Sequence, residues 1–481
     1  MKFNGRVLVI GCGFVSRCTI PLILRHVHMP PQNITVIDLK DFRKSIEDAI
    51  NKGVIFKIDS INKENFKRKL SSYVSEGDLV VDLAVNIASQ DILEWCHFNK
   101  VMYINSSIEE WSTPSNEEEG SLEYRTLYSR HMKITKMISK WDGGKGSTAV
   151  LEHGANPGLV SHFTKLGLKD IAEKIIKEKK TDKRVLLLKE ALKENDFAEI
   201  ARLVGLKTIH ISERDTQITN KPKKVNEFVN TWSVDGFYEE AIAPAELGWG
   251  THECKCTCEL NSFDEGACNA VYLSRMGMKT WVRSWVPSGE ITGMVIRHGE
   301  AVTLSEYLTV WKDGKPVYRP TVNYAYCPCD SAVNSLHELE MREFNLQEDQ
   351  RILTDEIISG YDELGVLLMG HDFKSWWVGS ILDIHESRQL APHQNATTLQ
   401  VACSVMAAML WMIKNPRQGL CFPEDIPYEE VLSFAKQYLG KLVSMESDWT
   451  PLKNKVNFPG QGRNLNIKDK DIWNFEAFLI L

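Results

Sequence analysis

Several enzyme signatures are absent from this sequence. It contains no G-x-S-x-G, H-E-x-x-H or Walker A pattern, so hydrolase and NTPase activities have no support in it. It also has no positively charged N-terminal segment leading into an apolar region, and no uninterrupted apolar run long enough to span a bilayer. We therefore expect a cytoplasmic protein that has no membrane partner.

The cysteines do not form a recognisable disulfide or zinc pattern. Their number, 11, is odd and they are scattered over 481 residues, which favours reduced thiols. His252, Cys254, Cys256 and Cys258 alternate along the chain, which would place them on one face of a strand, but structural zinc sites usually have paired C-x₂₋₄-C spacing. We predict no metal, and a thiophilic ion at this alternation is the less favoured alternative.

Composition places the chain among ordinary folded proteins. Hydrophobic residues make up 43% and charged residues 25%, and a length of 481 residues favours two domains over one. The net charge of −7 argues against nucleic acid as a partner and suits a cationic substrate.

A glycine-rich turn near the N-terminus predicts a dinucleotide site. Val7–Ile10 has the β-branched character of a buried strand, and Gly11 and Gly13 follow where a tight turn lets the backbone approach a phosphate. Ser16 occupies the place of the third glycine of G-x-G-x-x-G, so the first helix and strand must accommodate a slightly larger side chain.

A second predicted strand strengthens this interpretation. Asn33–Asp38 ends in a carboxylate at the separation expected for the acid that hydrogen-bonds a ribose 2′-hydroxyl. Because Asp38 would repel a 2′-phosphate, NAD is favoured over NADP. The predicted cofactor-binding residues are Gly11, Gly13, Phe14, Val15, Ser16, Asp38, Val85, Asn86 and Asn156.

Strand and helix patterns alternate from Arg6 to about Asn105, which indicates a parallel sheet covered on both faces. Leu79–Val85 is the expected fourth strand, and the carboxyl ends of such strands bind ligands, so Val85 and Asn86 should face the cofactor. The other expected strands are Val54–Ile58, Val101–Asn105 and Ser147–Asn156, and the expected helices are Phe42–Lys52, Asn65–Val74 and Asp91–Phe98.

The character of the chain changes after a turn at Gly154–Gly158. Asn156 in this turn lies where an amide could orient a ligand. Lys165–Val204 is helical and charged, as a solvated face is, and from Thr208 short β-like runs, Thr303–Val310 among them, indicate a mainly antiparallel sheet with one covered face.

A long apolar helix at Asn395–Ile413 is expected to pack back on the first domain. We therefore predict an α/β protein with a Rossmann-type parallel sheet domain at residues 1–157, completed by 385–481. Residues 158–384 form the predicted α+β substrate domain with a mainly antiparallel sheet.

Carboxylates and one tryptophan could together bind a flexible dication. Glu213 follows a predicted strand, Trp232 lies in another, and Glu239, Glu240 and Glu246 lie nearby in sequence. Carboxylates give charge-assisted hydrogen bonds to ammonium groups, and tryptophan is the best cation–π platform. The alternative is a set of surface acids and a core tryptophan, and sequence spacing does not separate the two.

Two further carboxylates have two interpretations each. Glu109 follows the predicted fifth strand, where a substrate would meet the nicotinamide, or it belongs to a solvated acidic loop that continues into Glu117–Glu119. Asp362 could lie at the mouth of a cleft or in a turn before a strand.

Long sequence segments spread over the whole chain resemble those of the bacterial homospermidine synthases, a family that in turn resembles the saccharopine dehydrogenases. The segments are GCGFVSR near the start, HGANPGLVS at 153–161, IHISERDTQ at 209–217, FVNTWSVDGF at 228–237, PAELGWGT at 244–251, YRPTVNYAYCPC at 318–329, DELGVLLMGH at 362–371 and APHQNATTLQV at 391–401. The resemblance implies that NAD⁺ accepts a hydride from putrescine. A second putrescine then displaces ammonia from the imine, and the hydride returns to the new Schiff base.

The resemblance also implies roles by position. It implies that Trp232 stabilises cationic intermediates with its ring and that Glu240 transfers protons, while Glu213 and Glu109 hold amino groups. Asn156 is expected to orient the substrate against the nicotinamide.

His298 and Asp362 match further substrate-binding positions. Putrescine and related polyamines are the implied partners, and the family suggests a homodimer, with 158–384 also forming the dimerisation domain. The alternatives are a saccharopine-type dehydrogenase that releases NADH, which would need several Arg or Lys for carboxylates, and a non-catalytic NAD sensor.

Overall fold

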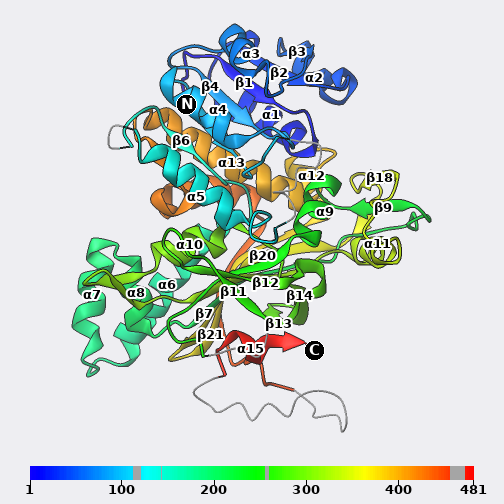
Figure 1. Cartoon of the computed structure of the whole chain (residues 1–481). Helices are drawn as coiled ribbons and strands as arrows, with labels where there is room; N and C mark the ends of the chain where they lie inside the picture. Colours follow the sequence, from blue (N-terminus) through cyan, green and yellow to red (C-terminus); the bar gives the residue numbers. More distant parts are fainter. Residues whose placement is uncertain (112–120, 142–143, 255–258, 455–471, 481) are drawn as a thin grey trace.

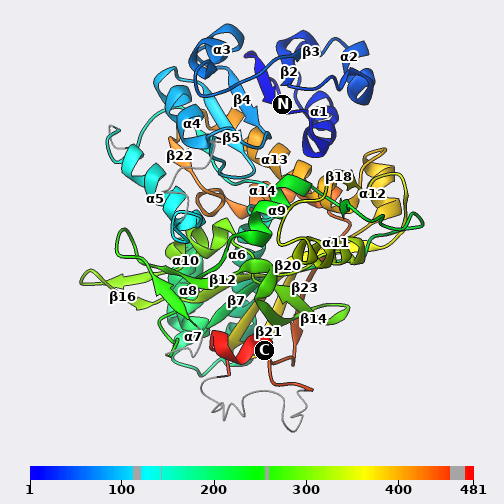
Figure 2. The same ribbon diagram turned by 45° about the vertical axis from the view of Figure 1, so that its right-hand side comes forward.

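The computed structural model describes residues 1–111, 121–141, 144–254, 259–454 and 472–480. Two sheets dominate it: a parallel sheet near the top of Figure 1 and a larger mixed sheet below it. Both Figure 1 and Figure 2 place the long helix α13 (Ala396–Lys414) between them.

The first sheet consists entirely of parallel strands among the described residues. Its strands, in spatial order, are β22 (Leu420–Cys421), β6 (Ala149–Val150), β5 (Met102–Asn105), β4 (Leu79–Asp82), β1 (Val7–Ile10), β2 (Ile34–Asp38) and β3 (Ile55–Ile58). The order reverses at β1, which is the point where open α/β sheets bind ligands. The Rossmann-type prediction is confirmed, although β4 ends three residues before the predicted strand does.

Strand β1 shows why this sheet is covered on both faces. Val7 and Val9 pack on the side of α13 and α1 (Phe14–His26), whereas Leu8 and Ile10 pack on the opposite side. That opposite side carries α3 (Phe66–Tyr73), α4 (Ser89–Phe98) and α5 (Leu127–Ile138). Because successive side chains of a strand point to opposite faces, an unbroken apolar run is what such a strand requires.

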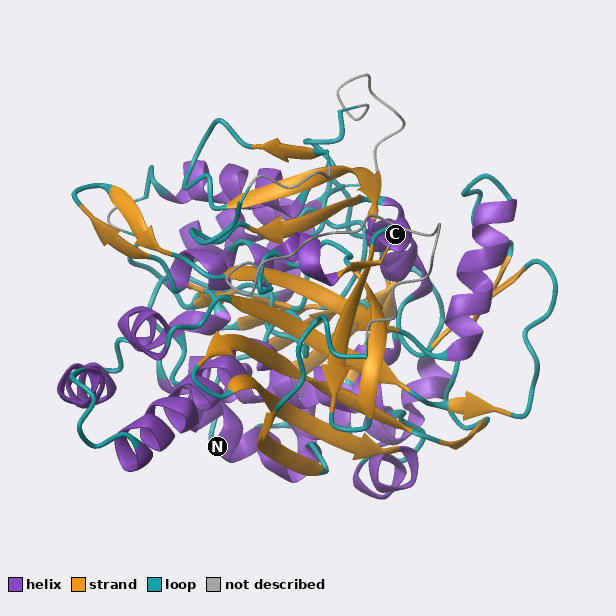
Figure 3. Ribbon diagram, turned by 90° about the horizontal axis from the view of Figure 1, so that it is seen from below, coloured by secondary structure: helices purple, strands orange, loops and turns teal. Residues whose placement is uncertain are grey.

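The second sheet is antiparallel except where β17 (Thr321–Cys327) pairs with β7 (Thr208–Asp215). Its remaining strands are β10 (Pro244–Gly248), β11 (Leu260–Ser262), β12 (Ala270–Met276), β13 (Trp281–Val286), β14 (Gly289–Met294), β20 (Tyr361–His371), β21 (Lys374–Asp383), β23 (Lys441–Ser447) and β24 (Leu479–Ile480). The mainly antiparallel prediction is confirmed. Figure 3 shows these strands crossing the middle of the molecule, with helices around them.

Both faces of the second sheet are covered, where the sequence pattern predicts only one. Ile209 and Ile211 of β7 belong to the core shared with α6 (Leu159–Glu178) and α8 (Phe197–Val204). His210 and Ser212 face the other way, and each lies within hydrogen-bond distance of the Ser284 hydroxyl on β13. Because that face carries polar residues, a prediction based on hydrophobic periodicity does not recognise it as buried.

Helix α13 connects the two sheets. Asn395 caps it by accepting a hydrogen bond from the Thr398 N–H, and the helix packs against α1, as expected. Among the described helices α13 alone is long and apolar enough to cross a membrane, and 83% of its apolar stretch is buried.

Two other predicted elements differ in the structure. Thr303–Val310, predicted as a strand, forms α10 (Thr303–Tyr307), whose β-branched and aromatic residues are overruled by packing. The helical stretch 165–204 divides into α6, α7 (Arg184–Glu194) and α8, because Asn195 and Gly205 end the last two in left-handed conformation.

The division of the chain into a first domain, 1–157 with 385–481, and a second domain, 158–384, stays a prediction. Strands β23 and β24 come from the C-terminal part assigned to the first domain, but they pair with the second sheet. The remaining elements are η1 (Pro31–Asn33), η2 (Arg43–Ile46), α2 (Glu47–Asn51), β8 (Ile218–Thr219), β9 (Glu227–Asn230), α9 (Val234–Ile242), η4 (Gly277–Lys279), η5 (Gly299–Ala301), β15 (Val310–Lys312), β16 (Lys315–Tyr318), α11 (Asp330–Met341), β18 (Asp349–Ile352), β19 (Ile357–Ser359), α12 (Ile384–Leu390), η6 (Pro423–Asp425), α14 (Tyr428–Ala435), η7 (Lys436–Tyr438) and α15 (Phe475–Phe478).

Candidate active site

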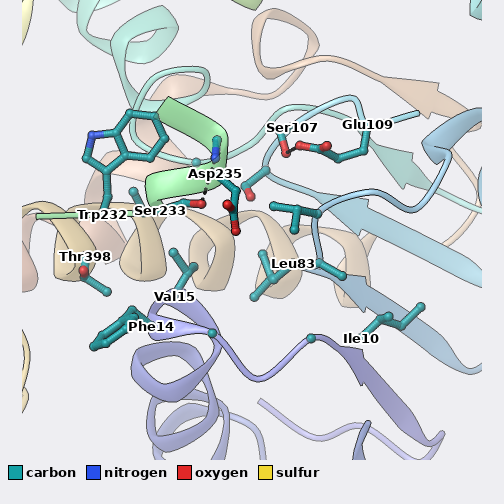
Figure 4. Close-up of a pocket in the computed structure, with 18 of the residues that line it drawn as sticks. Ile10, Phe14, Val15, Leu83, Ser107, Glu109, Trp232, Ser233, Asp235 and Thr398 are labelled. Carbon is teal, nitrogen blue, oxygen red and sulfur yellow. Dashed lines mark hydrogen bonds between the residues drawn. The ribbon is translucent and has the colours of Figure 1, made fainter. Parts of the chain in front are cut away.

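A cavity of about 690 Å³ lies at the carboxyl ends of the parallel strands and extends to the second sheet. Its lining brings together the β1–α1 turn, the loop after β4, the 154–157 turn, and residues of β7, α9, β17 and α13. Figure 4 shows Phe14 and Val15 at the start of α1 on one side and Trp232 with Ser233 and Asp235 on the other.

The β1–α1 turn is shaped to bring backbone close to a ligand. Gly11 has φ +86°, and a Cβ there would lie 3.0 Å from the Ala84 Cα, so the position requires glycine. Gly13 precedes α1, and a Cβ there would meet nothing within 4 Å. The N-terminus of α1 is therefore open to the cavity, and such termini bind phosphate groups.

The carboxylate of Asp38 lies beside this turn. It accepts hydrogen bonds from the backbone N–H groups of Cys12 at 2.7 Å and of Lys40 at 2.9 Å. Asp38, Val85 and Asn86 all line the cavity, as predicted for cofactor-binding residues. These residues fit a dinucleotide with a free ribose 2′-hydroxyl, because a second negative group at this place would meet a carboxylate.

Ser16 does not line the cavity, in contrast to the prediction. It is buried in the first turn of α1, and its hydroxyl has no hydrogen-bond partner in the described part of the chain. The residue occupies the close-packed place of the missing glycine and does not face a ligand.

At the other end of the cavity, Glu213 is held by two neutral donors. The Asn156 amide and the Tyr324 hydroxyl both donate to its Oε2, and the amide also lies 2.6 Å from the Tyr324 oxygen. Burial raises the pKa of Glu213 to about 7, against the effect of these two hydrogen bonds. The 154–158 turn and β7 thus bring Asn156 and Glu213 together.

Two more carboxylates lie behind Glu213. Asp362 lies inside β20, buried, and accepts a hydrogen bond from the Thr397 hydroxyl at 2.7 Å. Thr397 lines the cavity but Asp362 does not, so Asp362 lies one hydrogen bond behind the lining, and its role in substrate binding stays a prediction. Burial, Glu213 and Asp215 raise the pKa of Asp362 well above its usual value.

The described residues offer no lysine or arginine ion pair to this group, which consists of Glu213, Asp215 and Asp362. A buried cluster of carboxyl groups without a paired cation favours a cationic ligand nearby.

Trp232 is half-buried at the cavity wall. Its indole N–H donates to the Tyr326 hydroxyl at 2.9 Å, and its ring lies 5.5 Å from that of Phe237. Tyr326 stacks on Tyr324 with centroids 5.2 Å apart. The indole plane is therefore fixed, which a cation–π contact requires.

Glu240 and His298 both line the cavity, and both have a raised pKa. Burial raises the pKa of Glu240 to about 7, although His298 and Arg297 oppose the shift, and its Oε2 has no hydrogen-bond partner in the described structure. Burial disfavours charge on His298, but Glu300, Glu240 and Glu152 outweigh burial and raise its pKa to about 9. An acid and a cation of this kind can exchange protons near neutral pH.

Glu109 extends the acidic lining from the first sheet. It accepts a hydrogen bond from the Ser107 hydroxyl at 2.9 Å, and burial and Glu239 raise its pKa. The interpretation of Glu109 as a solvated loop residue is wrong for its carboxylate, which lines the cavity (Figure 4). Residues 117–119 lie outside the described residues.

Glu239 differs from its neighbour Glu240. The guanidinium groups of Arg130 and Arg297 both donate to it, and they lower its pKa to about 2 against the effect of burial. Glu246 is also occupied, because it accepts the backbone N–H groups of Leu127 and Tyr128 at 2.8 Å and caps α5. Both acids are therefore structural.

Comparisons with known proteins match the whole chain. Family models of the saccharopine dehydrogenase NADP binding domain and of the saccharopine dehydrogenase C-terminal domain match residues 7–150 and 154–447. The homospermidine synthase of Blastochloris viridis is 37% identical, covering 100% of this chain and 98% of the relative, and that of Mesorhizobium japonicum is 36% identical over 100% and 97%. The chain belongs to the homospermidine synthase family.

A solved structure of a homospermidine synthase agrees with this membership. The enzyme from Legionella pneumophila, determined in complex with NAD, matches with a TM-score of 0.86 and 35% identity, covering 100% of this chain and 99% of that chain. The resemblance predicted from the sequence segments is thus confirmed, as is the α/β fold class.

The sequence interpretation missed three groups of this site. Tyr324 and Tyr326 lie within YRPTVNYAYCPC, and their i, i+2 spacing, which places both on one face of a strand, is the signal that marks them. Thr397 lies in the first turn of α13, far away in sequence, and Glu300 follows His298 by two residues. No sequence signal marks those two.

The predicted absence of a metal stays a prediction. Cys256 and Cys258 of the alternation lie outside the described residues. Within the described ranges, no group of three or more His, Cys, Asp or Glu side chains is placed to hold a metal ion.

Proposed function

We propose that this chain joins two putrescine molecules into homospermidine and ammonia with NAD as a recycled hydride carrier. The observation that carries the proposal is the lining of one cavity by an open helix N-terminus at one end and by Glu213, Glu240 and Trp232 at the other. When bound, NAD takes a hydride from the carbon beside an amino group and returns it after the second amine has displaced ammonia.

The chain's own residues supply binding and orientation for this reaction. Glu213 receives an ammonium group while Asn156, which donates to Glu213, keeps the carboxylate turned toward the cavity. Glu109 binds an amino group at the side of the cavity formed by the parallel sheet. The Trp232 ring lies against the positively charged carbon and nitrogen of the intermediate, where it stabilises charge without acting as a nucleophile.

Glu240 moves the protons. An amine must lose its proton before the neighbouring carbon can give up a hydride, so a base with a pKa of about 7 is suited to the step at neutral pH. The charged imidazole of His298 lowers the pKa of Glu240 and keeps part of it ionised. The leaving ammonia takes up a proton from the same carboxyl group.

The lining argues against the saccharopine-type alternative. That reaction binds amino acids through their carboxylates and requires free Arg or Lys groups. Among the described residues that line the cavity there is no arginine, and Lys40 lies at the Asp38 end. Arg130 and Arg297 lie next to the cavity but are paired with Glu239.

The test uses putrescine deuterated on both carbons beside nitrogen, a small amount of NAD⁺ and an excess of unlabelled NADH. We expect homospermidine that keeps its full deuterium label and no net change in NADH absorbance. NADH rising in step with product would indicate a dehydrogenase, and no product at all would favour the NAD sensor.

Three further statements extend this proposal. We expect NAD in preference to NADP because of Asp38, related polyamines as additional substrates, and a cytoplasmic homodimer as the family resemblance implies. Sedimentation with and without NAD measures the last of these.

A further inference from the structure

Glu300 is a buried carboxylate that does not line the cavity but touches two parts that do. Its Oε2 lies 2.6 Å from Nδ1 of His298, and its Oε1 accepts a hydrogen bond from the backbone N–H of Gly158 at 3.0 Å. The side chains of Glu300 and His298 are only 1% and 5% exposed. Solvent therefore competes with neither contact.

The contact with Gly158 fixes the turn that carries Asn156. The turn is closed by the Gly154 N–H, which donates to the Pro157 carbonyl at 2.6 Å. Gly158 has φ +131°, and a Cβ there would lie 2.1 Å from the Gly154 oxygen, so the chain folds tightly on itself. Glu300 satisfies a backbone donor at this fold and thereby anchors Asn156 opposite Glu213.

The contact with His298 fixes a ring orientation. Because Nδ1 is directed at Glu300, Nε2 is the nitrogen left for the cavity that His298 lines. The ring also packs on Tyr324 with centroids 4.7 Å apart. The charged and titratable groups that interact with His298 are Glu300, Glu240, Glu152, Glu213 and Tyr324, and Arg297 precedes it in the chain.

We propose that Glu300 is a positioning residue that sets His298 and Asn156 in register, so that both face the same amine group. The inference rests on the proposed function, in which these two side chains serve one substrate. Glu300 itself touches no substrate and acts through both partners.

The decisive variant is Glu300→Gln. A glutamine can still accept from the Gly158 N–H, but its amide must donate to Nδ1 of His298, which removes the negative charge and reverses the tautomer. We expect kcat to fall at least about tenfold, and the pH at which kcat/KM declines on the alkaline side to move down by about 1–3 units. NAD affinity should stay near that of the unchanged enzyme, whereas at pH values below 9 Tm should fall, because protonated His298 loses the buried negative charge that stabilises it.

A double-mutant cycle separates positioning from mere stability. If Glu300 acts through His298, then His298→Gln with Glu300→Gln should have nearly the kcat of His298→Gln alone. The matched control is Asp355→Asn, which breaks a histidine–carboxylate pair with His393 at the surface, 2.9 Å long, and should change none of these values. A lowered Tm with an unmoved alkaline limb and additive losses of kcat would overturn the proposal.

A measurement without turnover keeps this inference distinct from the proposed reaction. The protonation of His298 is followed by NMR on enzyme carrying ¹⁵N-histidine, with its signal assigned through His298→Gln. We expect its midpoint to fall in Glu300→Gln whether or not putrescine is converted. An unchanged midpoint refutes the positioning role, whereas an unchanged protein that makes no homospermidine refutes only the reaction.

Discussion

The two ends of the cavity recognise their ligands by different physical means. The Asp38 end, around Gly11 and Gly13, offers backbone donors, apolar walls and two carboxylates that are already hydrogen-bonded, Asp38 to the backbone and Asp59 to Lys69 and Tyr73. The opposite end offers buried acids whose pKa values are raised, Glu213 and Glu240 among them. We name these the nucleotide end and the amine end.

The difference follows from what each end must do. A cofactor that is recycled has to be bound in both redox states, and fixed backbone groups provide this without changing their own charge. An amine that gains and loses protons needs partners that titrate in the same range. The comparison therefore predicts that changes at the amine end alter turnover, whereas changes at the nucleotide end alter affinity for NAD.

The largest effect should come from removing the titrating group itself. Glu240→Gln keeps the shape of the side chain and abolishes proton transfer, so kcat should fall about 10²–10⁴-fold while NAD affinity is retained. Steady-state kinetics with putrescine and calorimetry with NAD measure the two values. Glu239→Gln, at the adjacent residue, is not a suitable control for this variant. The loss of the Glu239 carboxylate leaves two arginines unpaired and should lower Tm.

A second test uses pH in place of mutation. The rate kcat/KM should rise as pH passes about 7, where Glu240 ionises, and fall as pH passes about 9, where His298 loses its proton. Each limb should approach a tenfold change per pH unit. The dissociation constant of NAD should be nearly constant between pH 6.5 and 9. If NAD affinity followed the same bell, the separation of the two ends would be wrong.

The stability of the folded protein should also depend on the charge of His298 at the amine end. The pKa of His298 is about 9 in the folded state against an ordinary value of 6.5, so its protonation stabilises the fold fully below pH 6.5. That contribution is lost as pH rises through 9.

The nucleotide end could be predicted from the sequence because its elements are local. Val7–Ile10 and Gly11 specify a strand and a turn within a few residues, and Asp38 ends the next strand. The same local reasoning failed for most of Thr303–Val310, because its first five residues form α10 and only Val310 belongs to a strand.

The amine end could be only partly predicted, because it is assembled from distant segments. Glu213, Trp232 and Glu240 were found through segments that resemble the family, whereas spacing alone left them indistinguishable from surface acids and a core tryptophan. That Asp362 lies behind Thr397 depends on how α13 returns to β20, a contact between distant segments. Likewise, Glu239 differs from the adjacent Glu240 because Arg130 and Arg297, from two distant segments, both donate to Glu239.

A smaller effect at the amine end should come from Trp232→Ala. A desolvated cation–π contact contributes about 2 kcal/mol, so kcat should fall about 30-fold with NAD still bound. Trp232→Phe keeps a ring but loses the hydrogen bond to Tyr326, and its kcat should lie between that of Trp232→Ala and that of the unchanged enzyme. Equal losses of kcat and of NAD affinity would contradict the assignment of this ring to the amine.

The smallest effect should come from Gly13→Asp, at the nucleotide end. Gly13 has φ −70° and open space where a Cβ would lie, so the fold should accept the aspartate without strain. Its charge would face a phosphate, and like charges a few ångströms apart near a surface cost about 1–4 kcal/mol, which weakens NAD binding at least about fivefold. Gly13→Ala adds the same carbon without charge and is the matched control. At saturating NAD both variants should keep the kcat and the putrescine KM of the unchanged enzyme, because the amine end is built from other segments. A loss of kcat that excess NAD does not restore would mean that the two ends are coupled through α1.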